Sequence, residues 1–274
     1  MRGAFPPLAP KPDSCYILYL GIETAIFLFF AGALGGALNA VAGGGSFIAF
    51  PALLFSGVAP IAANATNTVA LWVGVTASTG AYRKHLDISR RVMIPLTVTS
   101  LIGGIAGAYL LLHTPAQTFL RVLPWLMLGA TLLFIFGKQL SRGTGGSIAR
   151  DASTSALTIA SIFELVVAVY GGYFGGGVGI LNLAMLAALG MTDIHAMNAL
   201  KVVLGGIING VAVITFVLAG AVAWKQGSVM IAGALFGGYL GAHYAQKLPP
   251  AWIRAFVVVV GLGMTAYFFW KAYH

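Results

Sequence analysis

Two glycine triplets lie inside apolar sequence, and they are the positions in this chain best suited to binding an ion. One triplet spans residues 43–45 and precedes Ser46, and the other spans residues 175–177 and precedes Val178. A helix that begins at Ser46 or Val178 presents backbone N–H groups without intrahelical partners, and its dipole adds roughly half a positive charge there. Such helix starts bind anions without basic side chains, and the Ser46 hydroxyl adds a donor to the first. The alternative is that the glycines only permit tight turns and close packing.

Polar side chains follow each triplet at a similar distance. The stretch NATNT places Asn64, Asn67 and Thr68 on one face of a helix, because residues three and four apart are neighbours there. Lys201 follows the second triplet inside an apolar run, where inserting a lysine costs on the order of 3 kcal/mol. We expect Lys201 to face the interior of a helix bundle and to bind a negatively charged ligand there. The alternative is a structural ion pair with Glu164, and the two coexist if substrate releases Lys201 from that carboxylate.

Glu164 is itself a candidate for carrying a coupling proton, because carboxylates inside a membrane are costly and often belong to proton pathways. Glu23 lies near the beginning of its apolar run, which favours a position at the membrane interface. Asn182, Asn209 and His243 are isolated polar residues, and we interpret them as hydrogen-bonded packing groups.

Signatures of an enzyme are weak throughout the sequence. GGGSF superficially resembles a serine nucleophile on a glycine-rich turn, yet no histidine has an evident claim to be its base. No HExxH or GxxxxGKS/T motif occurs, and the single cysteine, Cys15, excludes a CxxC metal site. We therefore predict no catalytic residue, no metal site and no cofactor.

The composition indicates which elements must position these residues. Hydrophobic residues make up 59% of the 274-residue chain and charged residues only 8%, against about 25% in an ordinary soluble protein. We therefore predict an all-α polytopic membrane protein. Most of the basic residues behind the formal charge of +9 fall at segment ends, where they set orientation and contact lipid headgroups rather than nucleic acid.

Apolar runs predict about eight full transmembrane helices and two short, glycine-initiated half-helices. The eight spans are 16–41, 61–82, 92–112, 119–137, 155–173, 196–219, 227–245 and 252–270. The half-helices, at 46–55 and 178–189, fall below the ~20 residues that a full crossing needs. A glycine break is tolerated at membrane depth only where protein encloses it or where it lines a cavity. Two such breaks in matching halves of a chain are typical of a transporter's binding site.

The sequence predicts two homologous halves. A disordered N-terminal tail covers residues 1–15, the first transmembrane repeat 16–140, a linker 141–154 and the second repeat 155–274. The triplets are 132 residues apart, whereas GGIAGA recurs as GGYLGA, and Asn64 as Asn198, at an offset of 134 residues. The same offset pairs Asn67 with Lys201.

Two orientations in the membrane are open. The basic loop RKHLDISRR is cytoplasmic by the positive-inside rule, and the linker is basic as well. If the short pieces only re-enter the membrane, the halves are parallel and both termini are cytoplasmic. If each half makes an odd number of crossings, the halves are inverted and the termini lie outside. The distribution of Lys and Arg favours the first arrangement, whereas inverted repeats are common among transporters.

These motifs resemble the sulfite exporter TauE/SafE family of membrane transporters. The resemblance extends from about residue 22 to residue 271 and is most specific in ALNAVAGGGSFIAFPALL followed by AANATNTVA. It implies a permease of the bacterial inner membrane that moves small sulfur-containing or organic anions, such as sulfite, sulfoacetate or thiosulfate, coupled to an ion gradient. The second triplet continues as GGGVG and lacks the serine, so the two halves need not contact the substrate equally.

We predict a secondary transporter of a small anion, in which one half moves against the other to give alternating access. The predicted substrate-binding residues are Gly43, Gly44, Gly45, Ser46, Asn64, Asn67, Thr68, Gly175, Gly176, Gly177 and Lys201, with Glu164 as the proton-coupling candidate. Backbone N–H groups of the triplets, neutral hydrogen bonds from the NATNT stretch and the one full charge of Lys201 hold the anion. The partners are then the anion, membrane lipid and a coupling ion. An anion channel that uses the same residues is the alternative function.

Overall fold

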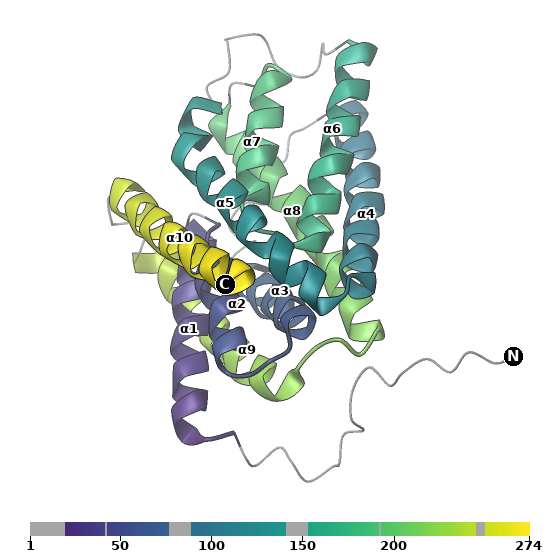
Figure 1. Ribbon diagram of the computed structural model, residues 1–274. Helices are drawn as coiled ribbons and strands as arrows, with labels where there is room; N and C mark the ends of the chain where they lie inside the picture. The colour runs from purple at the N-terminus through teal and green to yellow at the C-terminus, as the bar shows by residue number, and fades with distance from the viewer. Residues whose placement is uncertain (1–19, 42, 77–88, 141–152, 192, 245–249) are drawn as a thin grey trace, which may run out of the picture.

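The chain folds into α-helices, as its composition predicts. The structure is a computed structural model that describes residues 20–41, 43–76, 89–140, 153–191, 193–244 and 250–274. Ten helices and no strand occur in these residues (Figure 1). The helices are α1 (Ile22–Val41), α2 (Ser46–Phe55), α3 (Pro60–Thr76), α4 (Arg90–His113), α5 (Ala116–Leu140), α6 (Thr154–Tyr173), α7 (Val178–Ala188), α8 (Ile194–Leu218), α9 (Trp224–Tyr244) and α10 (Pro250–Tyr273).

Local sequence explains several helix boundaries. Ser89 and Ser153 precede α4 and α6, and their hydroxyls accept hydrogen bonds from backbone N–H groups in the first turn of each helix. Pro60 opens α3, where its missing N–H would have no intrahelical partner in any case. The first helix differs from the prediction, because it begins at Ile22 after Gly21 rather than at residue 16.

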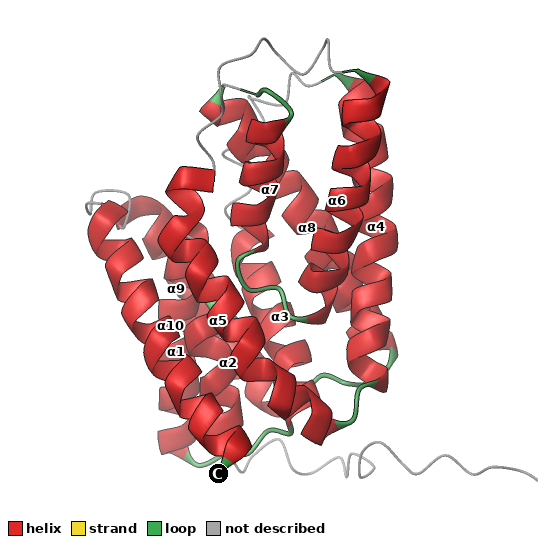
Figure 2. Ribbon diagram, turned by 45° about the horizontal axis from the view of Figure 1, so that its top comes forward, coloured by secondary structure: helices red, strands yellow, loops and turns green. Residues whose placement is uncertain are grey.

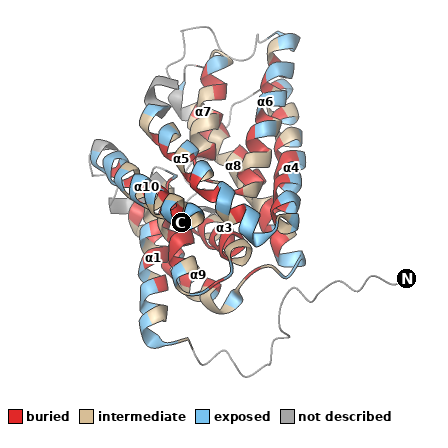
Figure 3. Cartoon of the chain, in the orientation of Figure 1, coloured by how far each residue is buried: buried red, intermediate tan, exposed pale blue. Residues whose placement is uncertain are grey.

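Six of the helices are long and apolar enough to cross a membrane. They are α1, α4, α5, α6, α8 and α10, while α2 and α7 are shorter apolar helices. Outward-facing apolar side chains such as Ile105, Ile162 and Val259 are at least half exposed, and exposed residues follow the outer faces of α4, α6 and α10 (Figure 3). The protein is therefore an all-α, multi-pass membrane protein, and the count of eight full spans stays a prediction.

The helices pack in two main groups, each of which contains helices from both predicted halves of the chain. The most extensive contacts join α1 to α9 and α4 to α6. In addition, α3 packs against α9, and α8 packs against α4. Glycines permit this close approach. A Cβ atom at Gly237 would overlap the carbonyl oxygen of Ala33 in α1, and one at Gly107 would overlap that of Val169 in α6. GGIAGA and GGYLGA are thus helix-packing surfaces, as expected of small residues in membrane helices.

The first helices of the two predicted halves, α1 and α6, run in opposite directions. α1 begins at the lower end of the molecule and α6 at its upper end (Figures 1 and 2). α4 begins beside α6, since the Arg91 guanidinium donates to the Thr154 hydroxyl at 3.1 Å. The arrangement that the basic residues favour has parallel halves, in which α1 and α6 would run in the same direction. For this pair of helices, the prediction of parallel halves is wrong.

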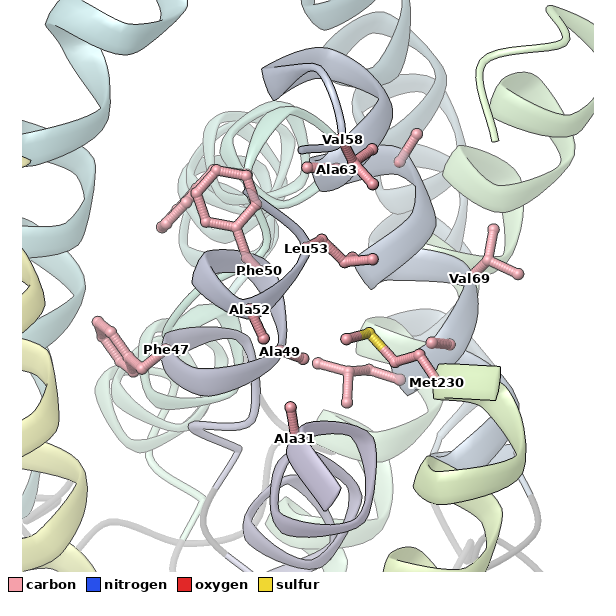
Figure 4. Close-up of a cluster of buried hydrophobic side chains, with 14 of the residues drawn as sticks. Ala31, Phe47, Ala49, Phe50, Ala52, Leu53, Val58, Ala63, Val69 and Met230 are labelled. Carbon is pink, nitrogen blue, oxygen red and sulfur yellow. The ribbon is translucent and has the colours of Figure 1, made fainter. Parts of the chain in front are cut away.

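Protein encloses the first half-helix, α2. Six of its ten residues are buried, and Phe47, Phe50 and Leu53 project from it into surrounding helices (Figure 4). The Phe50 ring makes edge-to-face contacts with Phe119 of α5 and with Phe174, which follows α6. Gly44 and Gly45, which directly precede α2, are buried as well, whereas Gly43 is exposed. The start of α2 is therefore enclosed by protein, as a helix start at membrane depth requires.

Candidate functional site

Both glycine triplets separate a long helix from a short one. α2 begins at Ser46 and α7 at Val178, the two residues at which the sequence predicts a helix start. Gly43, Gly175 and Gly177 have φ angles of 83°, 84° and 79°. Only glycine adopts this left-handed region without steric cost, so these three positions need glycine for the turn itself.

Each break leaves backbone N–H groups free. Among the described residues, the N–H groups of Gly45 and Ser46 find no acceptor at the first break. Those of Gly177 and Val178 likewise find none at the second. These donors lie at the positive ends of the α2 and α7 dipoles, and both starts are therefore suited to an anion.

Two asparagines of α3 connect the two breaks. Nδ2 of Asn67 donates to the hydroxyl of Ser46, the first residue of α2, at 3.2 Å. One turn earlier, Nδ2 of Asn64 donates at 2.9 Å to the carbonyl of Tyr173, the last residue of α6. Both asparagine side chains are buried, with 1% of their surface exposed. The two breaks therefore lie beside the same face of α3.

These contacts change the role expected of the α3 side chains. The Oδ1 atoms of Asn64 and Asn67, rather than their nitrogens, are left buried without a partner among the described residues. A carbonyl only accepts hydrogen bonds, so the contact with Tyr173 fixes the orientation of the Asn64 amide. The Thr68 hydroxyl donates to the Asn64 carbonyl within α3, at 2.9 Å. These three residues support the breaks in this conformation, and their contact with substrate stays a prediction.

Lys201 lies beside the start of α7. A Cβ atom at Gly179, the second residue of α7, would lie 3.2 Å from Cδ and 3.8 Å from Cε of Lys201. The side chain is partly buried, and among the described residues its ammonium group has no hydrogen bond or ion pair. The methylene groups of Lys201 therefore lie next to the second helix start, and its amino group has no partner among the described residues.

Glu164 does not form the ion pair with Lys201 that the sequence offered as an alternative. The Glu164 side chain is fully buried, and its Oε1 accepts from the Ser100 hydroxyl of α4 at 2.6 Å. Its Oε2 has no partner among the described residues. A buried carboxylate with one neutral donor is costly when charged, so proton binding would remove much of that cost. Sequence reasoning missed Ser100, because one serine in an apolar helix carries no signal of its own.

Tyr170 holds the second break in place and was also missed. Its hydroxyl donates to the Gly176 carbonyl at 2.6 Å. The C=O and N–H of one trans peptide point in opposite directions, so this hydrogen bond also sets the direction of the Gly177 N–H. Tyrosine is common near helix ends in membranes, so its presence here does not by itself predict this contact.

The isolated polar residues divide into two kinds. Asn209 donates to the Gly205 carbonyl within α8, at 2.9 Å, as a hydrogen-bonded packing group would. Asn182 is fully buried in α7, yet neither of its side-chain polar atoms has a partner among the described residues. The interpretation of Asn182 as a hydrogen-bonded packing group is therefore wrong. Glu23 lies exposed in the first turn of α1.

Several predictions concern positions outside the described residues. They include the tail over residues 1–15 with Cys15, most of the basic loop, the linker over residues 141–152 and the side chain of His243. Within the described part of the chain, no group of three or more His, Cys, Asp or Glu side chains could hold a metal ion.

Known proteins resemble this chain over most of its length. The family model for the sulfite exporter TauE/SafE matches residues 28–268. A probable membrane transporter protein of Haemophilus influenzae is 30% identical over 248 residues, which cover 90% of this chain and 95% of that one. The probable membrane transporter protein YfcA of Escherichia coli is 28% identical over 242 residues, 87% of each chain. No solved structure matches. The chain is thus a membrane transporter protein that belongs to the sulfite exporter TauE/SafE family.

Proposed function

We propose that this protein is a secondary-active transporter that carries a small anion across the bacterial inner membrane by alternating access. Its substrate is sulfite or a related sulfur-containing, organosulfonate or carboxylate anion, and the protein is a permease rather than an enzyme. The observation that carries this proposal is the pair of helix starts with free N–H groups beside one face of α3. Lys201 adds a full positive charge next to one of them.

Electrostatics explains why such a site suits an anion. Two helix dipoles and one ammonium group converge there, and no acidic residue occurs in α2, α3, α7 or α8. Because Gly45, Gly177 and Val178 are buried, the interaction of their N–H groups with a charged ligand would be stronger than it is in solution.

Two inverted repeats, α1–α5 and α6–α10, account for the arrangement of helices. Packing of α1 on α9 corresponds to that of α6 on α4, and packing of α3 on α9 to that of α8 on α4. Trp72 of α3 donates a 3.0 Å hydrogen bond to the carbonyl of Gly206 of α8, its counterpart at the offset of 134 residues. These exchanged contacts support a local two-fold axis between α3 and α8, with eight full spans and the half-helices α2 and α7.

The bodies that move in the transport cycle are then not the sequence halves themselves. One body contains α1, α2, α3 and α9, and the other contains α4, α6, α7 and α8, because these helices make their main contacts within each set. The half-helices belong to different bodies, so motion between the bodies would open the anion site to one side at a time.

Coupling and orientation follow from the same arrangement. Glu164 is the proton-coupling group, since its buried carboxyl has an unpartnered oxygen. Arg90 and Arg91 place the beginning of α4, and the adjacent beginning of α6, on the cytoplasmic side. An anion channel that uses the same residues is the second candidate.

A panel of anions on the purified protein tests the proposal. Sulfite, thiosulfate, sulfoacetate and acetate are added one at a time, and the unfolding temperature is measured. A substrate at one hundred times its Kd should stabilise the folded protein by about 2.7 kcal/mol. Flux in proteoliposomes should saturate and respond to an imposed proton gradient. Flux without saturation or gradient dependence would indicate the channel, and neither stabilisation nor flux with any anion would contradict both functions.

A further inference from the structure

The second break lies across one face of α8. At one end, Lys201 lies against Gly179 of α7, with its Cδ 3.2 Å from a Cβ atom at that position. At the other end, Oδ1 of Asn209 lies 3.7 Å from a Cβ atom at Gly175. Residues four apart share a helix face, so Gly205 lies on this face between the lysine and the asparagine.

Open space lies beside Gly205. Apart from its chain neighbours and the adjacent backbone of α8, a Cβ atom at Gly205 would have no atom within 4 Å, and the same holds for Gly206. By contrast, a Cβ atom at Gly35, Gly45 or Gly172 would overlap or crowd neighbouring atoms. The space is bounded along the helix by a charged side chain and by an amide, both of which are partly exposed.

The first half of the chain does not have a matching space. At the offset of 134 residues, Gly205 corresponds to Leu71 of α3. Leu71 is buried, and its Cδ2 lies 3.3 Å from a Cβ atom at Gly35 of α1. A buried leucine side chain therefore stands in the first half at the position where the second half has a glycine with open space beside it.

We propose that the body of the substrate occupies the space beside Gly205, with its anionic group at Lys201 and the start of α7. This inference rests on the proposed anion transport and deepens it. The substrate is then an organic anion, whose substituent extends along α8 from Lys201 toward Asn209. A bare inorganic oxyanion would fill only the charged end. The two breaks thus have unequal roles, and the second one selects the substrate.

Filling the space tests this inference. Gly205→Leu copies the residue at the corresponding position of the first half. Gly263→Leu is the matched control, because a Cβ atom at Gly263 also has no atom within 4 Å, but this residue is exposed on α10. Binding of sulfite, methanesulfonate, ethanesulfonate and propanesulfonate is measured by ligand-induced thermal shift for each purified protein.

We expect the unmodified protein and Gly263→Leu to bind alkanesulfonates more tightly than sulfite. Gly205→Leu should weaken the binding of ethanesulfonate and propanesulfonate at least tenfold, whereas its affinity for sulfite should change less than twofold. Equal weakening of all four anions, unchanged binding of all four, or a preference of the unmodified protein for sulfite would each overturn the inference. If Gly205→Leu does not fold, Gly205→Ala must show the same ranking with a smaller effect. Failure of every anion to bind the unmodified protein would instead contradict the proposed transport.

Discussion

Among the residues that the structure describes, Lys201 is the basic side chain that lies beside a helix start, and anion binding should depend on it. Hydrogen bonds to charged groups contribute roughly 1.5–3 kcal/mol, so Lys201→Met should weaken anion binding about 10- to 100-fold. Saturation of anion uptake in proteoliposomes measures this change. Lys225→Met, in the first turn of α9, is the control and should leave uptake unchanged. If Lys201→Met took up the anion with the rate and affinity of the unmodified protein, the assignment of Lys201 to the anion site would be wrong.

Sequence alone identified the residues whose presence in a membrane is costly. A lysine, a carboxylate and two glycine breaks in apolar sequence each need a structural reason, and this need identifies Lys201 and Glu164 as candidates. Ser100 and Tyr170 are ordinary residue types that gain their roles only from contact with Glu164 and Gly176. The Ser100–Glu164 contact joins residues 64 positions apart, and no local pattern predicts it.

At the level of elements, the small-residue faces of α1 and α9 allow their backbones to approach closely. A Cβ atom at Gly237 would overlap the Ala33 carbonyl, so Gly237→Ala should force these helices apart. Overpacking of this kind typically costs about 1–3 kcal/mol, even though alanine favours helix more than glycine does. Thermal unfolding in detergent measures the loss. Gly263→Ala, where a Cβ atom has free space, should be neutral or slightly stabilising; equal effects of both changes would contradict this account of the packing.

Helix boundaries were predictable where the sequence contains a strong local signal. The starts of α2 and α7 follow from the glycine triplets, because glycine both ends the preceding helix and permits the left-handed turn. The start of α1 has no such signal. Apolar residues continue upstream of Gly21, so hydropathy places the boundary too early.

For the whole molecule, the direction of the helices predicts which ends face the cytoplasm. Single cysteines are introduced in a Cys15→Ser background, one by Ser153→Cys and the other by Ala116→Cys. Ser153 precedes α6 and lies near the beginning of α4, whereas Ala116 begins α5 and lies near the end of α4. A membrane-impermeant maleimide added to intact cells should label Ala116→Cys only. Lysed cells should show labelling of both variants, which serves as the control. Labelling of Ser153→Cys in intact cells would contradict the proposed orientation and indicate the opposite one.

The sequence could not determine the direction of the halves, because that depends on the path of the short helices. A half-helix that returns within the membrane changes the number of crossings without changing the apolar pattern. The positive-inside rule is a bias among loops, and here it gave the wrong preference between two arrangements that differ only in this path. Opposite directions of α1 and α6 become evident only when the helices are placed together (Figure 1).

In the proposed alternating-access cycle, the hydrogen bond between Trp72 and Gly206 would make the two end states unequal in energy. A carrier built from inverted repeats faces the other way once its halves have exchanged conformations. Gly206 has no side chain that could donate to the carbonyl of residue 72, so the exchanged conformation would have no hydrogen bond equivalent to this one. A loss of about 1 kcal/mol corresponds to a population ratio of about five. In the proposed cycle, the carrier without substrate would therefore open toward one side of the membrane more often than toward the other.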